Sequence, residues 1–199
     1  MSQESEGMHG INYKQFKLKQ GYFDNRSSLH GINHTYRVMF NVQQIGLAAG
    51  MNHEVFWAWC AAFIHDMARK HDGYCTEHGY WSAKTKLPLF EKLFIKEGVI
   101  PEGLEAIKLA VTNHSLAEEI SFDHPYYKTV ALLKDADALD RVRISENNLK
   151  IEMLRFPESK KMVDFAKKLF HRTDSLKLKD FGMLIKISEE IKLADITDL

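Results

Sequence analysis

An apolar run at residues 55–64 is followed directly by a His-Asp pair, His65 and Asp66. Apolar residues recur at helical spacing and leave almost no polar side to the run, which predicts a helix at the centre of the fold. The run is too short to cross a bilayer, which takes about 20 residues. Two polar side chains therefore fall at the edge of the core, where burial without partners costs several kcal/mol. Either they cap and hydrogen-bond the helix end, or a metal ion satisfies both.

The composition is that of an ordinary globular protein. The 199 residues fit one domain, and a hydrophobic content of 45% is enough for a packed core. A formal net charge of zero with scattered Lys and Arg gives no strong sign of nucleic-acid binding. Cys60 and Cys75 imply no disulfide framework, and neither a signal peptide nor a membrane-spanning stretch is apparent. We therefore expect a cytoplasmic protein with no membrane partner.

Further helices are predicted to carry a His or Asp on an apolar face. His34 shares a face with the apolar residues that follow it, up to Gly50, which should end that helix. His114 ends the apolar face of a helix that begins near residue 101, and Asp137 lies on the apolar face of residues 126–141. His78 lies in a short helix whose small residues at 79, 82 and 83 allow close packing. An unpaired Asp at such a position would be costly.

The predicted fold is all-α, since no stretch alternates convincingly as a strand would. Residues 1–28 form an N-terminal segment, with disorder expected at 1–9 and a short helix at 13–22. Residues 29–143 form the helical domain, and residues 144–199 a helical extension packed on the same domain. Asn52 and Thr76 are predicted helix caps. The amphipathic helices of the extension could form the interface of a homodimer.

Several polar residues on buried helix faces are better explained together than one by one. A single buried histidine is more often a hydrogen-bonded core residue than a metal ligand, and a purely structural helical domain is one interpretation of this chain. One convergent metal site accounts for the whole set at once. Nitrogen and carboxylate ligands without cysteine favour Fe, Mn, Zn, Ni or Co, and Mg is an alternative. The candidate ligands are His34, His65, Asp66, His78, His114 and Asp137.

Three motifs in this order resemble the HD-domain superfamily of metal-dependent phosphohydrolases. They are His34-x-x-Arg37-Val38, the apolar run into His65-Asp66, and the stretch Lys-Asp-Ala-Asp-x-Leu-Asp at 134–140. The resemblance covers about residues 29–143 and implies an all-helical bundle with His34, His65, Asp66 and Asp137 as metal ligands.

The position of two further histidines is similar to HD subfamilies that hold two metals. On that pattern Asp66 bridges the ions, His34, His65 and Asp137 bind the first, and His78 and His114 bind the second. In the alternative, one metal is bound and His78 and His114 support it or contact phosphate. The chain lacks the Gly-Tyr-Pro signature and the paired histidines of the cyclic-dinucleotide phosphodiesterases. That specificity is therefore not carried over.

The resemblance implies hydrolysis of a nucleotide or another small phosphate ester or anhydride by a metal-activated water. Asp66, Arg37, Arg69 and His30 are the candidate catalytic residues. Candidate substrate-binding residues are Arg37 and Arg69, because guanidinium groups suit phosphate, and Lys134, which could also reach a phosphate.

Other roles for these residues, and other functions for the chain, remain alternatives. The arginines could instead form salt bridges with Asp72, Asp135 or Asp140, and Asp135 could hold a ligand histidine. His30 could act as a general acid or simply begin a helix. A diiron oxygenase of the same fold and a non-catalytic nucleotide-binding module are the alternative functions.

Overall fold

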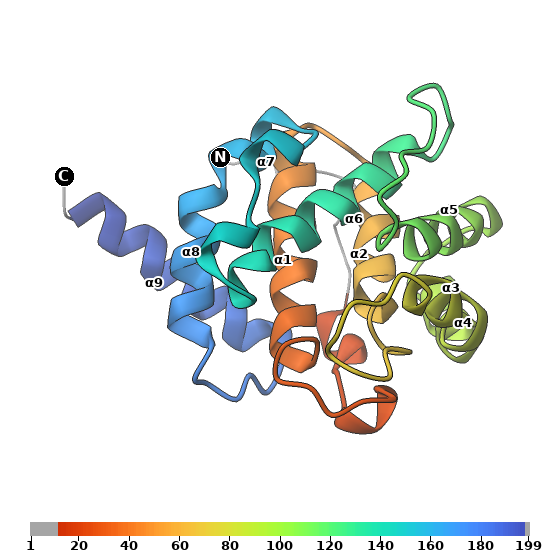
Figure 1. Cartoon of the computed structure of the whole chain (residues 1–199), viewed down its shortest axis with the longest axis horizontal. Coiled ribbons are helices and arrows are strands. Elements are labelled where there is room, and N and C mark those ends of the chain that lie inside the picture. The colour runs from red at the N-terminus through yellow and green to blue at the C-terminus, as the bar shows by residue number, and fades with distance from the viewer. Residues whose placement is uncertain (1–11, 198–199) are drawn as a thin grey trace.

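The computed structural model describes residues 12–197, and within them it contains helices and no strand, which confirms the all-α prediction (Figure 1). The disorder predicted for residues 1–9 lies outside this range. The α-helices are α1 Ile32–Ala48, α2 His53–Ile64, α3 His78–Thr85, α4 Leu87–Lys96, α5 Pro101–Asn113, α6 Tyr127–Leu139, α7 Pro157–Lys161, α8 Val163–Thr173 and α9 Phe181–Thr197. Among the described residues, no helix is long and apolar enough to cross a membrane.

The helix α2 lies at the centre of the fold. Every residue from Val55 to Ile64 is buried, because α1, α5 and α6 all pack against this helix. A helix with neighbours on several sides has no face for water, which is why the run carries no polar stripe. In Figure 1, α1 and α2 lie side by side and α6 crosses them.

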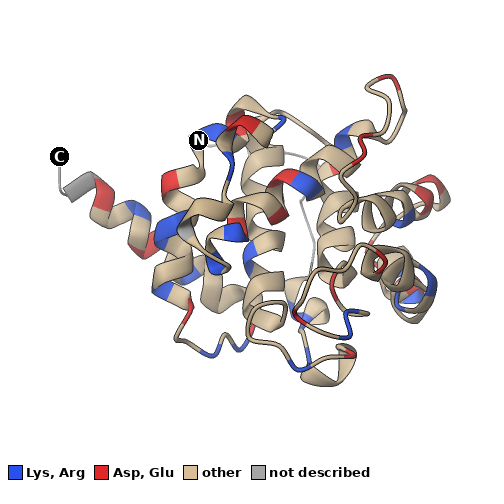
Figure 2. Ribbon diagram, in the orientation of Figure 1, with Lys and Arg blue, Asp and Glu red and all other residues tan. Residues whose placement is uncertain are grey.

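Two further layers cover the central helices. The helices α3 and α4 pack on one side, where α3 contacts α5, and α8 and α9 pack against α1 on the other side (Figure 1). Gly50 follows α1 with a φ of 66°, so the left-handed turn that ends this helix suits glycine. Basic and acidic residues are interspersed over the helices and loops, as Figure 2 shows.

The helix predicted at residues 13–22 is wrong. The structure has two short 3₁₀ turns there, Tyr13–Phe16 and Gln20–Tyr22, with extended backbone at Lys17 between them. Phe16 and Leu18 are both buried, and the Leu18 N–H donates to the hydroxyl of Tyr36. Tertiary contacts therefore override the local helical preference of this segment.

Of the two predicted helix caps, Asn52 is confirmed in position and Thr76 is wrong. Asn52 occupies the N-cap position of α2, but its side chain makes no capping hydrogen bond within the described structure. The N-cap of α3 is Glu77 rather than Thr76. The Thr76 carbonyl instead accepts a hydrogen bond from Ser115 Oγ, which ties the start of α3 to the segment after α5.

Candidate metal centre

The candidate ligands come from five helix ends that meet at one place. His34 lies in the first turn of α1, and His78 is the first residue of α3. His114 follows the last residue of α5, and Asp137 lies in the last turn of α6. His65 and Asp66 follow α2 directly, where the chain turns and the Met67 N–H bonds the Ile64 carbonyl. The structure thus brings together all six candidates, although they span more than a hundred positions of the sequence.

His34 and His65 face each other through their Nε2 atoms. The Nδ1 of His34 lies 2.8 Å from Asp140 Oδ2, and the Nδ1 of His65 lies 2.7 Å from the Ala62 carbonyl. A carbonyl or carboxylate oxygen only accepts, so each Nδ1 carries the hydrogen and each Nε2 keeps its lone pair. The two Nε2 atoms are 3.1 Å apart. Two lone pairs at this distance repel unless a cation lies against both.

His78 and His114 form a second pair of the same kind. The Nδ1 of His78 lies 2.9 Å from the Cys75 carbonyl, and the Nδ1 of His114 lies 2.7 Å from the Val111 carbonyl. Their Nε2 atoms are 2.9 Å apart, again with both lone pairs facing inward. The backbone around α3 and α5 therefore sets the orientation of both rings.

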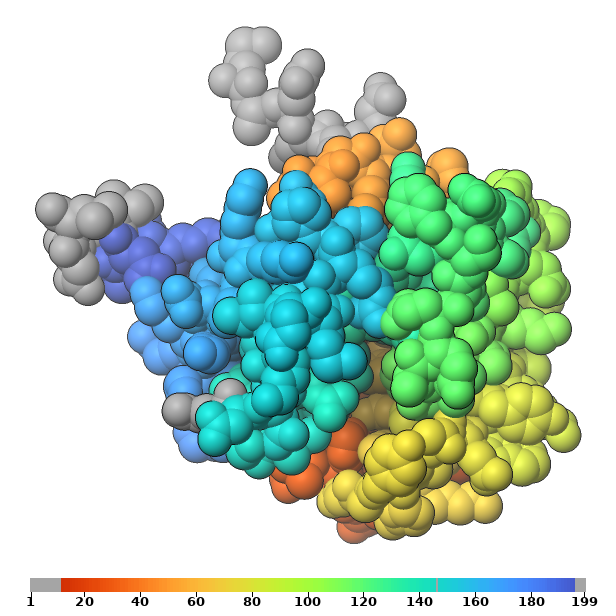
Figure 3. Space-filling model, turned by 45° about the horizontal axis from the view of Figure 1, so that its top comes forward, coloured from red at the N-terminus to blue at the C-terminus, as the bar shows by residue number. Residues whose placement is uncertain are grey.

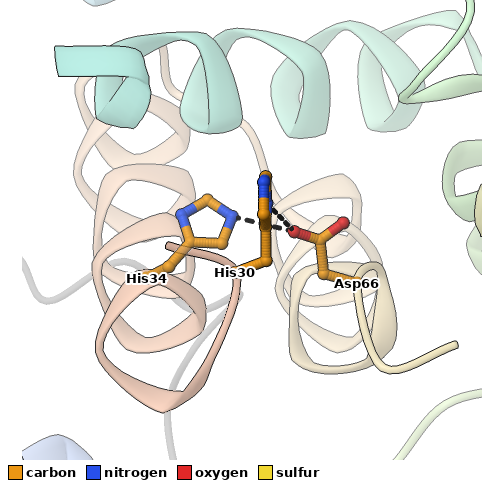
Figure 4. Close-up of side chains that lie close together, drawn as sticks. All are labelled: His30, His34 and Asp66. Carbon is orange, nitrogen blue, oxygen red and sulfur yellow. Dashed lines mark hydrogen bonds and ion pairs between the residues drawn. The ribbon is translucent and has the colours of Figure 1, made fainter. Parts of the chain in front are cut away.

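Asp66 lies between the two pairs and turns one carboxylate oxygen toward each. Its Oδ2 is 3.3 Å from His34 Nε2 and 3.6 Å from His65 Nε2. Its Oδ1 is 3.0 Å from His78 Nε2 and 3.7 Å from His114 Nε2. Figure 4 shows this carboxylate with His34 and with His30, whose Nδ1 is 2.9 Å from Oδ2.

The spacing and chemistry of these donors fit divalent ions. Two nitrogens that bind one ion at the usual 2.0–2.1 Å stand roughly 2.9–3.4 Å apart for bond angles near 90–109°. Both Nε2 pairs have this separation. Asp137 Oδ1 lies 3.3 Å from His34 Nε2 and, although buried, receives no hydrogen bond from any described residue. Groups that could hold an ion include His34 with His65 and Asp137, and His65 with Asp66 and His114.

The electrostatics keep the donors in the state that a metal binds. Burial lowers the pKa of His65 to about 3, because the charged form is poorly solvated. Burial alone would raise the pKa of Asp66, but His65, His114, His30 and His34 together lower it well below its usual range. Burial opposes ionisation of Asp137 as well, yet Arg143 above all lowers its pKa. His65 is therefore neutral and both carboxylates are ionised, as metal binding requires.

Two of the side chains proposed for substrate binding, Arg37 and Lys134, already pair with oxygens of the protein itself. Arg37 Nε lies 2.6 Å from Asp140 Oδ1 and its Nη2 lies 3.0 Å from Asp140 Oδ2, which is the salt-bridge alternative raised by the sequence. Lys134 Nζ donates to the Glu118 carbonyl at 2.7 Å and to Glu119 Oε1 at 3.1 Å. The contacts of both side chains are thus filled by protein oxygens.

Arg69 is different, because it lies against the second histidine pair. Its Nε is 3.8 Å from Asp66 Oδ1 and has no hydrogen-bond partner in the part of the chain that the structure describes. Its Nη2 donates to the Gly73 carbonyl at 3.3 Å. Part of this guanidinium is therefore free to bind an anion.

Asp140 and Arg143 were not assigned to the site from sequence. Asp140, rather than Asp135, supports a candidate ligand histidine, because it bonds both His34 Nδ1 and Arg37. Asp135 instead accepts from the backbone N–H groups of Arg155 and Phe156. Asp140 ends the third motif, so the signal for it was present. Arg143 lies three residues further on, and no motif marks it.

Comparisons with known proteins identify the family and its fold. The HD domain family matches residues 31–142. The fold is similar to a crystal structure of a predicted HD superfamily hydrolase from an uncultured Thermotogales bacterium, with a TM-score of 0.54 and 21% identity over 80% of this chain and 84% of that chain. A search among curated protein sequences finds no match. Since the family match covers more than half of the chain and includes the helices that carry the histidines and aspartates, the chain belongs to the HD-domain family.

Proposed function

We propose that this protein is a metal-dependent phosphohydrolase with a two-ion centre. The single observation that carries the proposal is the pair of facing Nε2 contacts, His34 with His65 and His78 with His114, on the two sides of Asp66. One ion would be held by the first pair with Asp137 and Asp66 Oδ2. The other would be held by the second pair with Asp66 Oδ1.

Bound divalent ions would lower the pKa of a water molecule and offset the charge of a phosphoryl oxygen. The chain supplies orientation and further charge. Asp140 fixes the tautomer of His34, and Arg37 holds Asp140 in place, so Arg37 acts on the centre without touching the substrate. Arg69 lies beside the second pair and is suited to a phosphate oxygen. His30 gives its Nδ1 hydrogen to Asp66 and keeps Nε2 for proton transfer.

The proposed substrate is a small phosphate ester or anhydride, with a nucleotide as the first choice. Figure 3 shows the surface hollowed where the segments near residues 70–80, 115–125 and 145–155 meet. The first two of these segments carry exposed rings, with Tyr74 92% and Phe122 78% exposed. Exposed aromatic rings can stack on a base, which supports a nucleotide over a simple sugar phosphate.

Metal content by inductively coupled plasma mass spectrometry tests the two-ion centre. Wild-type protein purified without chelators should hold about two ions per chain, His78→Ala about one, and Asp66→Ala almost none. His53→Ala is the matched control, because the His53 side chain is 63% exposed and no candidate ligand. About one ion in both wild type and His78→Ala would refute the two-ion centre.

Activity needs a second measurement on the same preparations. Protein loaded with Mn, Fe, Ni, Co or Zn is incubated with nucleoside mono- and diphosphates and with dinucleotide polyphosphates, and phosphate release is followed. Hydrolysis that is lost in Asp66→Ala is the expected result. Oxygen consumption by the iron form without hydrolysis would identify an oxygenase instead. Nucleotide binding that survives both metal removal and Asp66→Ala would identify a binding module.

A further inference from the structure

Arg143 has a buried side chain, and two of its three nitrogens have no hydrogen-bond acceptor among the described residues. It is the last residue of the 3₁₀ turn Asp140–Arg143, and its side chain is 5% exposed. Its Nε and Nη1 have no hydrogen-bond partner among residues 12–197. Arg37, whose side chain is also buried, has an acceptor for all three of its nitrogens in Asp140 and Thr173. The two arginines therefore differ in what they still have to bind.

The neighbours of the third nitrogen of Arg143, Nη2, do not accept a good hydrogen bond from it. Its Nη2 is 3.3 Å from His30 Nδ1, but that atom already carries the hydrogen donated to Asp66 Oδ2. Asp137 Oδ1, 3.4 Å away, is in ion-pair range but receives no hydrogen bond from the described part of the chain. Asp140 Oδ2, 4.0 Å from Nη1, is taken by His34 and Arg37.

The surroundings of Arg143 indicate which ligand would supply the missing hydrogen-bond acceptors. A guanidinium donates a rigid fork of hydrogen bonds that matches the oxygens of a phosphoryl group. Arg143 lies beside the group formed by His34, His65 and Asp137, whereas Arg69 lies at the opposite histidine pair. Among the buried cations of residues 12–197, an anion held at the first ion position would thus meet Arg143, whose Nε and Nη1 lack a partner.

We infer that Arg143 is a substrate-binding residue that holds a phosphoryl oxygen at the His34–His65–Asp137 end of the centre. This inference rests on the proposed phosphohydrolase function. It assigns to Arg143 the contact that the sequence suggested for Arg37. A buried guanidinium without hydrogen-bond acceptors lowers the stability of the ligand-free protein. Such groups are common at sites where a ligand supplies the missing acceptor.

Binding of inorganic phosphate to metal-loaded protein, measured by isothermal titration calorimetry, tests the inference. Arg143→Gln should weaken phosphate binding by about tenfold to a hundredfold, the value of a charge-assisted hydrogen bond. Arg143→Lys should recover part of the affinity. Arg141→Gln is the matched control, because Arg141 lies in the same 3₁₀ turn, is exposed, and loses the same charge. It should bind phosphate like wild type.

Ion content separates substrate binding from a structural role. It should be unchanged in Arg143→Gln, because Arg143 makes no hydrogen bond to a candidate ligand. The metal-free variant should melt below wild type, since Asp137 loses the cation that lowers its pKa, so the melting temperature does not decide the question. Lost ions together with weakened phosphate binding would instead assign Arg143 to the support of Asp137 and overturn the inference.

The failure of this inference can be told from failure of the proposed function. If wild type hydrolyses a phosphate compound and Arg143→Gln behaves like Arg141→Gln in phosphate binding, only the inference is overturned. If wild type loads metal but neither binds phosphate nor hydrolyses any phosphate compound, the proposed function is overturned and the inference with it.

Discussion

Asp140→Asn should damage both the fold and the metal centre, because one carboxylate serves both. Asp140 is 1% exposed and accepts from Arg37 through both of its oxygens. The same carboxylate accepts the Nδ1 hydrogen of His34. Asparagine keeps the shape but has one acceptor oxygen and no charge, so it cannot satisfy both partners.

The structure gives the size of the effect in two ways. Breaking a buried ion pair by removing one partner costs about 3–5 kcal/mol, since the other charge is left uncompensated. Burial raises the pKa of Asp140, but Arg37 and His34 outweigh it and lower that pKa from 3.8 to about 2. A shift of this size corresponds to about 2–3 kcal/mol of stabilisation of the ionised form. We therefore expect a loss of about 3 kcal/mol in the free energy of unfolding.

The effect on metal should be separable from the effect on stability. Loss of the carboxylate that orients a ligand histidine typically weakens metal binding about 10–100-fold. Urea unfolding of chelated protein measures the first effect, and metal titration of the folded variant measures the second. Asp135→Asn is the control, because Asp135 is as buried and holds Arg155 and the Phe156 backbone instead of a histidine. It should lose stability and keep wild-type metal affinity.

The reasoning is refuted if Asp140→Asn binds metal as tightly as Asp135→Asn does. It is also refuted if Asp140→Asn unfolds at the same urea concentration as wild type. Either result would mean that the contacts of Asp140 with His34 and Arg37 do not determine the properties of the centre.

Three other predictions concern the packing of α3 on α5, the bound metal and a buried tyrosine. In Gly79→Ala the new Cβ would lie 2.5 Å from the Val111 carbonyl, so α3 and α5 must separate. Metal analysis of this variant should show that the second ion is lost. The control Gly21→Ala, whose Cβ would have nothing within 4 Å, should keep the second ion. Chelation of wild type should lower its melting temperature by about 5–10 °C, because bound ions stabilise only the folded state, and an unchanged value would contradict a structural contribution from metal. Burial raises the pKa of Tyr36 to about 12. The contribution of Tyr36 to the free energy of unfolding should therefore be complete below pH ~10 and should fall by up to about 1.4 kcal/mol per pH unit as the pH rises from there to about 12. Urea unfolding of Tyr36→Phe should lack this fall, and an identical fall in the variant would contradict the prediction.

The helices and the convergence of the histidines were accessible from sequence because helical periodicity is a local property. His34 and Asp137 stand on apolar faces, and apolar faces meet in the core, so their side chains had to approach one another. The small residues beside His78 likewise indicated close packing, and the Cβ that Gly79 lacks would in fact collide with the backbone of α5. The turns at residues 13–22 were not accessible in this way, because the contact of Leu18 with Tyr36 decides them.

The sequence by itself determined which residues could face a metal, through motif order and the side of each helix on which they stand. Only the tertiary structure decided what each arginine does. Arg37 and Arg69 both follow a candidate ligand by three positions, yet Arg37 meets Asp140, which is 103 positions away in the chain, while Arg69 keeps a free Nε. Spacing along a helix places a side chain on a face, but the acceptors it finds there belong to other helices. For the same reason Arg143, which no motif marks, lies against Asp137 with two nitrogens that no described residue binds.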